Sequence, residues 1–189
     1  SLVKWLREAG LTGPLRTRTD SEGAIQAVAE AVAATRVAST VLETTPVRSS
    51  ASLGAGEHWS QVLASQVRVL RAEIQKRWNI RVATDSPLLP WMVRHAEYLM
   101  NRFQPLTHNQ QTPYEMVQGR PWKGALYHLS ETVMGRKNMA LKQPKLEMRW
   151  LKGAWLGRST QSGEHVVATA EGVKMCRTVK SLPQADQSV

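Results

Sequence analysis

The sequence predicts a mixed α/β fold with additional helices, followed by a small all-β barrel. Residues 1–43 alternate helical patterns with short β-branched runs, an order typical of an α/β sheet. From Glu131 onward the pattern changes to short alternating apolar and polar runs separated by turn residues, which favours a small barrel. We therefore expect an α/β and helical part over residues 1–124, a barrel over 125–183 and a disordered tail over 184–189.

The N-terminal part reads as helix, strand, helix and strand in turn. Apolar residues ahead of Gly10 predict a short first helix, and the alternating stretch that follows predicts a strand ending at Asp20. The alanine-rich residues 21–36 predict a second helix, and the β-branched run 37–43 predicts a second strand. Ile25, Val28 and Val32 are expected to share one face of the second helix.

Two long helices are expected next. Residues 57–78 repeat apolar side chains at steps of three or four, namely Trp59, Leu63, Val67, Leu70, Ile74 and Trp78. The opposite face is polar and partly basic, and Glu57 is the carboxylate at its N-terminal end. A second apolar pattern predicts a helix within residues 86–103, with Pro90 near its start.

A capping box marks a third, shorter helix. Thr112 and Glu115 have the spacing of the box, and Pro113 stands at the first helical position between them. We expect this helix to end at Gly119.

Charge and cysteine content limit the possible functions. The formal charge is +10, and residues 1–43 are balanced, so the basic excess lies in the middle and C-terminal parts, where it would attract DNA or RNA. Cys176 is the single cysteine, so an internal disulfide and a thiolate zinc cluster are excluded. Its place in the sequence fits a small apolar strand residue. We find no stretch with the apolar length of a membrane helix and no secretion signal, so we expect a nuclear or cytoplasmic protein with no membrane partner.

Five stretches resemble, in the same order, the integrase region of copia-type retrotransposon polyproteins. They are "TDSEGAI", "ETTPVRSSASLGAGE", "LLPWMVRHAEYLMNRF", "TPYEMVQGRPWKG" and "KLEMRWLKGAWLGRSTQSGEHVVATAEGVKMCRTVKSLP". The resemblance implies a partial ribonuclease H-like core followed by an SH3-like barrel. It also implies DNA as a partner, a homo-oligomer, and a nuclear location.

The resemblance further implies a magnesium site. In the family, three acidic residues bind two Mg²⁺ ions that activate water or a DNA 3′-hydroxyl for attack on a phosphodiester bond. Asp20 and Glu57 match the second and third of these acids, as catalytic residues and as metal ligands. Carboxylate oxygens are natural Mg²⁺ ligands, and two ions ~4 Å apart can stabilise both the attacking and the leaving oxygen.

Simpler roles remain open for both acids. Asp20 could cap the helix that begins near Ser21, and Glu57 could be an ordinary first-turn glutamate. Glu22 is a second acidic candidate in the same turn as Asp20, although its place favours a role in the first turn of the helix.

Eight polar or basic residues are candidate nucleic-acid contacts. On the long helix, Gln61, Arg68 and Arg71 share the face of Glu57 and could approach DNA, although a solvated basic face explains the two arginines equally well. In the barrel, alternation predicts a basic outer face of Lys152, Arg158, Lys174, Arg177 and Lys180. Trp150 and Trp155 are expected to pack in the core or at its rim.

The sequence also departs from the family pattern. Leu53 and His58 replace the asparagine or glutamine and the arginine that usually flank the conserved glycine and glutamate. The family's first catalytic aspartate and its zinc-binding region lie upstream of the first residue of this chain. We therefore expect a fragment that binds Mg²⁺ poorly and does not join DNA strands alone, with an unpaired sheet edge.

Three functions follow from these observations. The first is a fragment of a retrotransposon integrase that is inactive alone. The second is a non-catalytic nucleic-acid-binding module derived from a transposon, and the third is a decayed reading frame without a selected role.

Overall fold

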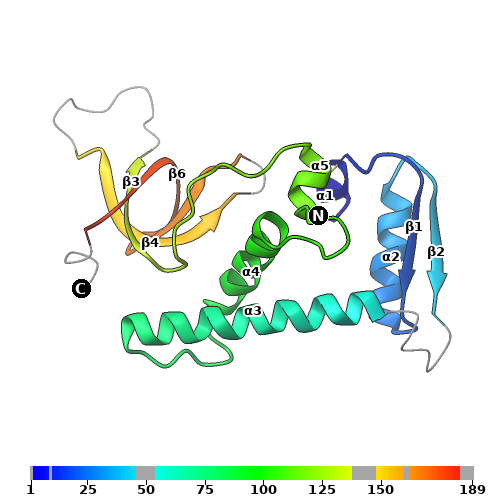
Figure 1. The fold of residues 1–189 in the computed structure, drawn as a ribbon, viewed down its shortest axis with the longest axis horizontal. Helices are drawn as coiled ribbons and strands as arrows, with labels where there is room; N and C mark the ends of the chain where they lie inside the picture. Colours follow the sequence, from blue (N-terminus) through cyan, green and yellow to red (C-terminus); the bar gives the residue numbers. More distant parts are fainter. Residues whose placement is uncertain (1, 9, 46–53, 138–147, 160–161, 184–189) are drawn as a thin grey trace. The chain divides into compact units, whose positions relative to one another are not determined.

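A computed structural model describes residues 2–8, 10–45, 54–137, 148–159 and 162–183 (Figure 1). Its helices and strands are, in chain order, α1 (Leu2–Glu8), β1 (Leu15–Thr19), α2 (Gly23–Thr35), β2 (Thr40–Thr44), α3 (Gly54–Trp78), α4 (Leu89–Phe103), α5 (Pro113–Gln118), β3 (Thr132–Lys137), β4 (Trp150–Arg158), β5 (His165–Thr169) and β6 (Gly172–Ser181). The predicted order of helices and strands is confirmed. The predicted disordered tail, 184–189, and the position of Leu53 lie outside the described residues.

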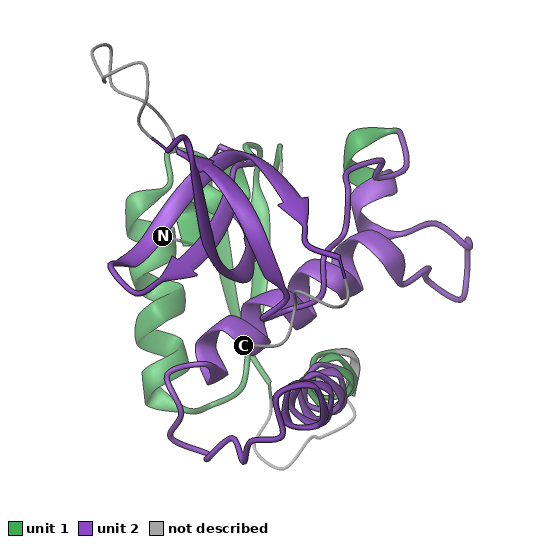
Figure 2. Cartoon of the chain, turned by 90° about the vertical axis from the view of Figure 1, so that its left-hand side faces the viewer, with its two compact units in different colours: residues 1–62, 116–119 green, residues 63–115, 120–189 purple. Residues whose placement is uncertain are grey.

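The chain divides into two compact units (Figure 2). Residues 1–62 and 116–119 form the first unit, and residues 63–115 and 120–189 form the second. The second unit therefore holds most of the long helices together with the barrel. The domain boundary that the sequence predicts between residues 124 and 125 stays a prediction.

The first unit contains a two-stranded parallel sheet. β1 pairs with β2 from Leu15 opposite Thr40 to Thr19 opposite Thr44, and α2 connects the two strands. A parallel pair needs such a crossover, because the chain must return to the starting edge before the second strand begins. This confirms the mixed α/β class, whereas a ribonuclease H-like core stays a prediction.

The predicted apolar face of α2 is buried only in part. Val32 is buried as expected, together with Ala29, but Ile25 and Val28 are 41% and 56% exposed. The buried residues Ala29 and Val32 lie further along α2 than Ile25 and Val28, and the sheet that the helix packs on has only two short strands. Such a small sheet covers little of the helix and leaves two β-branched residues of its first half in solvent.

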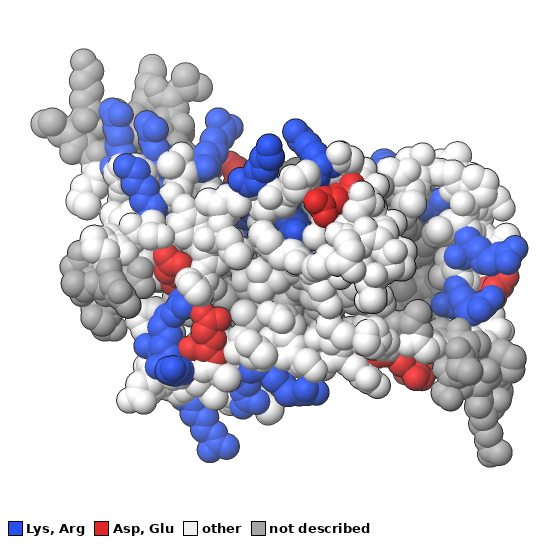
Figure 3. Space-filling model, in the orientation of Figure 1, with Lys and Arg blue, Asp and Glu red and all other residues white. Residues whose placement is uncertain are grey.

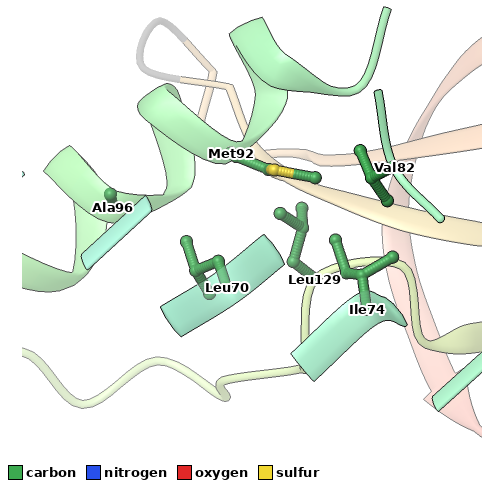
Figure 4. Close-up of a cluster of buried hydrophobic side chains, with 6 residues drawn as sticks. All are labelled: Leu70, Ile74, Val82, Met92, Ala96 and Leu129. Carbon is green, nitrogen blue, oxygen red and sulfur yellow. The ribbon is translucent and has the colours of Figure 1, made fainter. Parts of the chain in front are cut away.

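The core of the second unit lies where α3 and α4 pack together. Leu70 and Ile74 of α3 meet Met92 and Ala96 of α4, and Val82 and Leu129 complete the buried cluster (Figure 4). Leu63, Val67 and Trp78 pack against it, so the predicted apolar face of α3 is confirmed except for Trp59, which is 37% exposed. Trp78 also donates its indole N–H to Ser130 Oγ at 2.9 Å.

The start of α5 has the predicted capping box. The Thr112 backbone N–H donates to Glu115 Oε2 at 2.7 Å, and the Glu115 backbone N–H donates to Thr112 Oγ1 at 3.1 Å. These two bonds satisfy amide groups that have no partner within the helix. Gly119 follows the helix with φ +67°, a left-handed conformation that glycine adopts without strain.

The four C-terminal strands form a closed antiparallel barrel in which each strand pairs with two others. Trp155, Val167 and Cys176 are fully buried inside it, with Val133 and Val179. This confirms the predicted small barrel and the apolar role of Cys176, and the closed topology is compatible with an SH3-like barrel. Burial also raises the pKa of the Cys176 thiol.

Candidate metal ligands and nucleic-acid interface

Asp20 lies immediately after β1, at the edge of the sheet where both parallel strands have their carboxyl ends. The Glu22 backbone N–H donates to Asp20 Oδ1 at 3.1 Å, which closes a short turn ahead of α2. Glu22 itself is the N-cap residue and makes no side-chain cap. Asp20 therefore closes a turn ahead of α2 without being its N-cap residue, and its carboxylate makes no other hydrogen bond to a described residue.

Glu57 lies in the first turn of α3 and is exposed. Its carboxylate forms no hydrogen bond or ion pair with any residue in the described ranges. A first-turn glutamate still gains from the positive end of the helix dipole, so this position is favourable without a metal.

Asp20 and Glu57 belong to the same compact unit, and the carboxyl ends of β1 and β2 and the first turn of α3 lie at the same end of that unit in Figure 1. The described residues contain no group of three His, Cys, Asp or Glu side chains placed to hold a metal ion. Two carboxylates, one of them engaged in a turn, do not complete the site with three acids that two Mg²⁺ ions would need. Their role as metal ligands stays a prediction.

The three candidate contacts on α3 differ in their local bonds. Gln61 is exposed, and Arg68 donates from Nη1 to Ser65 Oγ at 3.2 Å while remaining exposed. Arg71 is half-buried and donates from Nε to the Val82 carbonyl oxygen at 2.9 Å and from Nη2 to the same oxygen. Arg71 therefore helps to hold the chain after α3, and its predicted DNA contact, like the other two, stays untested.

The five candidate contacts in the barrel fall into three groups. Arg158 is half-buried, and its Nη1 donates to the Gly163 carbonyl oxygen at 3.0 Å. Lys174 Nζ lies 3.6 Å from Glu171 Oε2, and Arg177 Nε lies 3.6 Å from Glu164 Oε1. Lys152 and Lys180 are exposed and form no ion pair with a described carboxylate.

Arg136 is a further exposed cation that the sequence reading missed. It lies directly opposite Trp150 in the β3–β4 register, and Met134, two residues earlier, lies opposite both Lys152 and Lys180. Residues paired directly across antiparallel strands point to the same side of the sheet, so all these side chains share the outer face of the barrel. The alternation of β3 carried this signal, because Arg136 follows Met134 at the strand period of two.

This outer face is positively charged. Figure 3 shows lysine and arginine atoms projecting from the part of the surface that the barrel forms in this view. We call the set of Arg136, Trp150, Lys152 and Lys180 the outer basic face. Such a face can approach a phosphate backbone without reading its sequence.

Two buried histidines have strongly lowered pKa values. Desolvation by burial lowers the pKa of His95 to about 4, partly opposed by Glu73, and His128 adds to the lowering. Desolvation and then Arg158 lower the pKa of His165 to about 4. Both imidazoles are therefore neutral near pH 7, and neither adds to the basic surface.

The sequence matches no protein-family model, and no curated protein is significantly similar to it. Among solved structures, the chain resembles one in the cryo-electron microscopy structure of the simian T-cell lymphotropic virus intasome in complex with PP2A regulatory subunit B56 gamma. The two chains are 15% identical with a TM-score of 0.42, and the match covers 97% of this chain and 62% of the other. The chain thus spans about three fifths of the length of that neighbour, and a likeness of this size assigns no function.

None of the described helices combines the length and the apolar character that crossing a bilayer requires. The copia-type resemblance, the magnesium site and a homo-oligomer stay predictions.

Proposed function

We propose that this chain binds nucleic acid through the outer basic face of its barrel, as part of a copia-type retrotransposon integrase whose metal-dependent DNA joining it does not carry out alone. The observation that carries the proposal is the closed antiparallel barrel with Arg136, Lys152 and Lys180 on one outer face. None of these three cations is paired with a carboxylate among the described residues. They are therefore available to phosphates.

The experiment that tests nucleic-acid binding is a titration of duplex DNA at several salt concentrations. Each phosphate neutralised by the protein releases condensed counterions, so the logarithm of the affinity should fall linearly with the logarithm of the salt concentration. Three engaged cations predict a slope of about −3. An affinity that does not depend on salt would point to a protein partner instead.

The integrase part of the proposal concerns Asp20 and Glu57. Asp20 ends a strand and Glu57 begins a helix at the same end of one compact unit, which supports a shared cation between them. When a divalent ion is bound there, it supplies charge stabilisation at the reacting phosphate. The residues themselves would contribute carboxylate oxygens only, so a further acidic ligand is required.

A manganese titration followed by amide NMR tests this pairing without any need for activity. Mn²⁺ prefers the same oxygen ligands as Mg²⁺ and broadens nearby signals. If the two acids share an ion, the amides around Asp20 and Glu57 should broaden together, and Asp20→Asn should reduce the broadening at both positions. Exposed Glu30 on α2 is the matched control, because Glu30→Gln should change neither.

A second candidate, a non-catalytic module derived from a transposon, is favoured by one observation. Asp20 Oδ1 already accepts the Glu22 amide, a role that needs no metal. In that case Mn²⁺ should broaden no signals at Glu57, while the salt-dependent DNA binding persists. A strand-joining assay of this chain alone gives a further test. Activity that Asp20→Asn abolishes would refute both the non-catalytic module and the expected inactivity of the isolated chain.

A further inference from the structure

Trp150 lies on the surface of the barrel among cations. It is the first residue of β4, opposite Arg136 of β3, and Lys152 follows it on the same face. Across β3, the Lys180 ammonium lies 5.4 Å from the centroid of the Trp150 ring. One aromatic ring is thus flanked by three positively charged side chains that come from β3, β4 and β6.

The core does not require this ring. Trp155, five residues later on β4, is fully buried in the barrel core. Trp150 remains partly exposed and belongs to neither buried cluster, although Leu151 beside it packs against the barrel interior. The sequence prediction of core or rim packing therefore holds for Trp155, while Trp150 has a surface environment.

The cations beside Trp150 differ from other barrel cations in their ion pairs. Lys174 and Arg177, elsewhere on the barrel, each lie near a glutamate. Arg136, Lys152 and Lys180 have no such carboxylate within the described ranges. Among the described residues the charges beside Trp150 are therefore positive, and a polyanion that reaches this face does not have to displace any of their acidic side chains.

An aromatic ring interleaved with cations has the chemistry that recognises a single strand. Unpaired bases offer their flat faces for stacking, whereas the bases of a duplex are already stacked on one another. We propose that the outer basic face binds single-stranded nucleic acid, with an unpaired base stacked on Trp150 and adjacent phosphates held by Arg136, Lys152 and Lys180.

The contact between Lys180 and Trp150 fits this role. At an exposed site, a cation over an aromatic ring is held less strongly than a stacked base. A base can therefore take the place of the ammonium group over the ring, and the flexible lysine can move to the neighbouring phosphate. The inference rests on the proposed nucleic-acid binding and adds a preference for unpaired bases at one residue.

The test measures the binding of three labelled probes to the whole chain by fluorescence anisotropy. The probes are an oligothymidylate, a strand of equal length with abasic sites, and a duplex. A length of about 15 nucleotides is enough to cover one small barrel. The abasic strand keeps the phosphates and lacks the bases. Oligothymidylate should bind about tenfold more tightly than the abasic strand, because stacking contributes only to the former.

Trp150→Leu keeps an apolar side chain and removes the aromatic face. We expect it to lower the affinity for oligothymidylate about tenfold, to the level of the abasic strand, with little effect on the duplex. Trp150→Phe keeps a smaller aromatic face and should retain most of the affinity. Trp59→Leu, at an exposed tryptophan on α3, and Lys174→Ala, at a lysine near a glutamate, are the matched controls and should leave the preference unchanged.

Equal affinity of the natural chain for oligothymidylate and the abasic strand would overturn the inference, and this comparison needs no variant. A Trp150→Leu chain that stays folded and keeps its full affinity for oligothymidylate would also overturn it. Salt-dependent binding of the duplex alone would leave the proposed function standing and reject the single-strand preference. Binding of none of the probes would reject both.

Discussion

The indole of Trp155 and the imidazole of His165 form a hydrogen bond inside the barrel. Trp155 donates from Nε1 to His165 Nδ1 at 3.0 Å, and the Tyr127 ring packs against both rings. His165 can accept this bond only when Nδ1 carries no proton. The neutral state of one histidine therefore satisfies the buried indole at the centre of the barrel.

This bond makes the barrel sensitive to acid. The pKa of His165 is about 4 in the folded chain and 6.5 in the unfolded one, so the unfolded state binds a proton more readily. The contribution of neutral His165 to stability is fully present above pH 6.5 and is lost progressively as the pH falls towards 4. His95 has a pKa shift in the same direction and should add to the loss.

Urea unfolding of the natural chain and of His165→Asn, followed from neutral pH to about pH 4.5, measures this effect. Asparagine can still accept a hydrogen bond but does not titrate in this range, so the variant should lose less stability on acidification. His108→Asn, at an exposed histidine, is the control and should follow the natural chain. Parallel curves for the natural chain and His165→Asn would contradict the assignment.

At the scale of elements, the barrel depends on one close approach of its strands. Gly153 of β4 lies opposite Val133 of β3, and a Cβ atom at this position would overlap the carbonyl oxygen of Ala168 on β5. It would also lie 2.7 Å from Val167 Cγ1. A backbone oxygen cannot move aside as a flexible side chain can, so β4 and β5 can approach in this way only with glycine at residue 153.

Gly153→Ala should therefore destabilise the barrel by about 1–3 kcal/mol, the usual cost of overpacking. The midpoint of thermal or urea unfolding measures the change. Gly13→Ala is the matched control, because no heavy atom lies within 4 Å of a Cβ built there. The account of β4 would be wrong if both variants unfolded at the same midpoint as the natural chain.

Local signals predicted the elements well, because their causes lie within a few residues. The capping box of α5 is formed by Thr112 and Glu115 themselves, and the alternation of β4 follows from the strand period. The buried face of α2 was harder to predict. Ile25 and Val28 are exposed beside a sheet of only two short strands, and the helix pattern does not encode how large the sheet is.

Side-chain roles were predicted less completely, because they depend on contacts between segments that are distant in the sequence. Arg71 and Arg158 look alike in a sequence as basic residues, yet each donates to a backbone carbonyl brought near by the fold. Trp150 and Trp155 share one strand and differ in environment, because their register places one outside and the other inside the barrel. Alternation predicted Lys152 and Lys180 on the outer face of the barrel, but only strand pairing shows that Arg136 lies on the same face.

At the scale of the whole molecule, the formal charge is +10, and some of the cations that produce it lie together on the outer basic face of the barrel. Lys174 and Arg177 lie near glutamates, whereas the cations of the outer basic face have no acidic partner among the described residues. The metal-binding prediction gains no comparable support, because Asp20 and Glu57 are not joined by a third acidic ligand within the described ranges. Nucleic-acid binding by the barrel is therefore the central claim.

The salt dependence of duplex binding by charge variants tests this claim most directly. The account predicts that Lys152→Ala combined with Lys180→Ala makes the slope of log affinity against log salt shallower by about two, one unit for each lost phosphate contact. Lys174→Ala, whose ammonium lies near Glu171, should change the slope far less. An unchanged slope in the double variant, with the barrel still folded, would contradict the account.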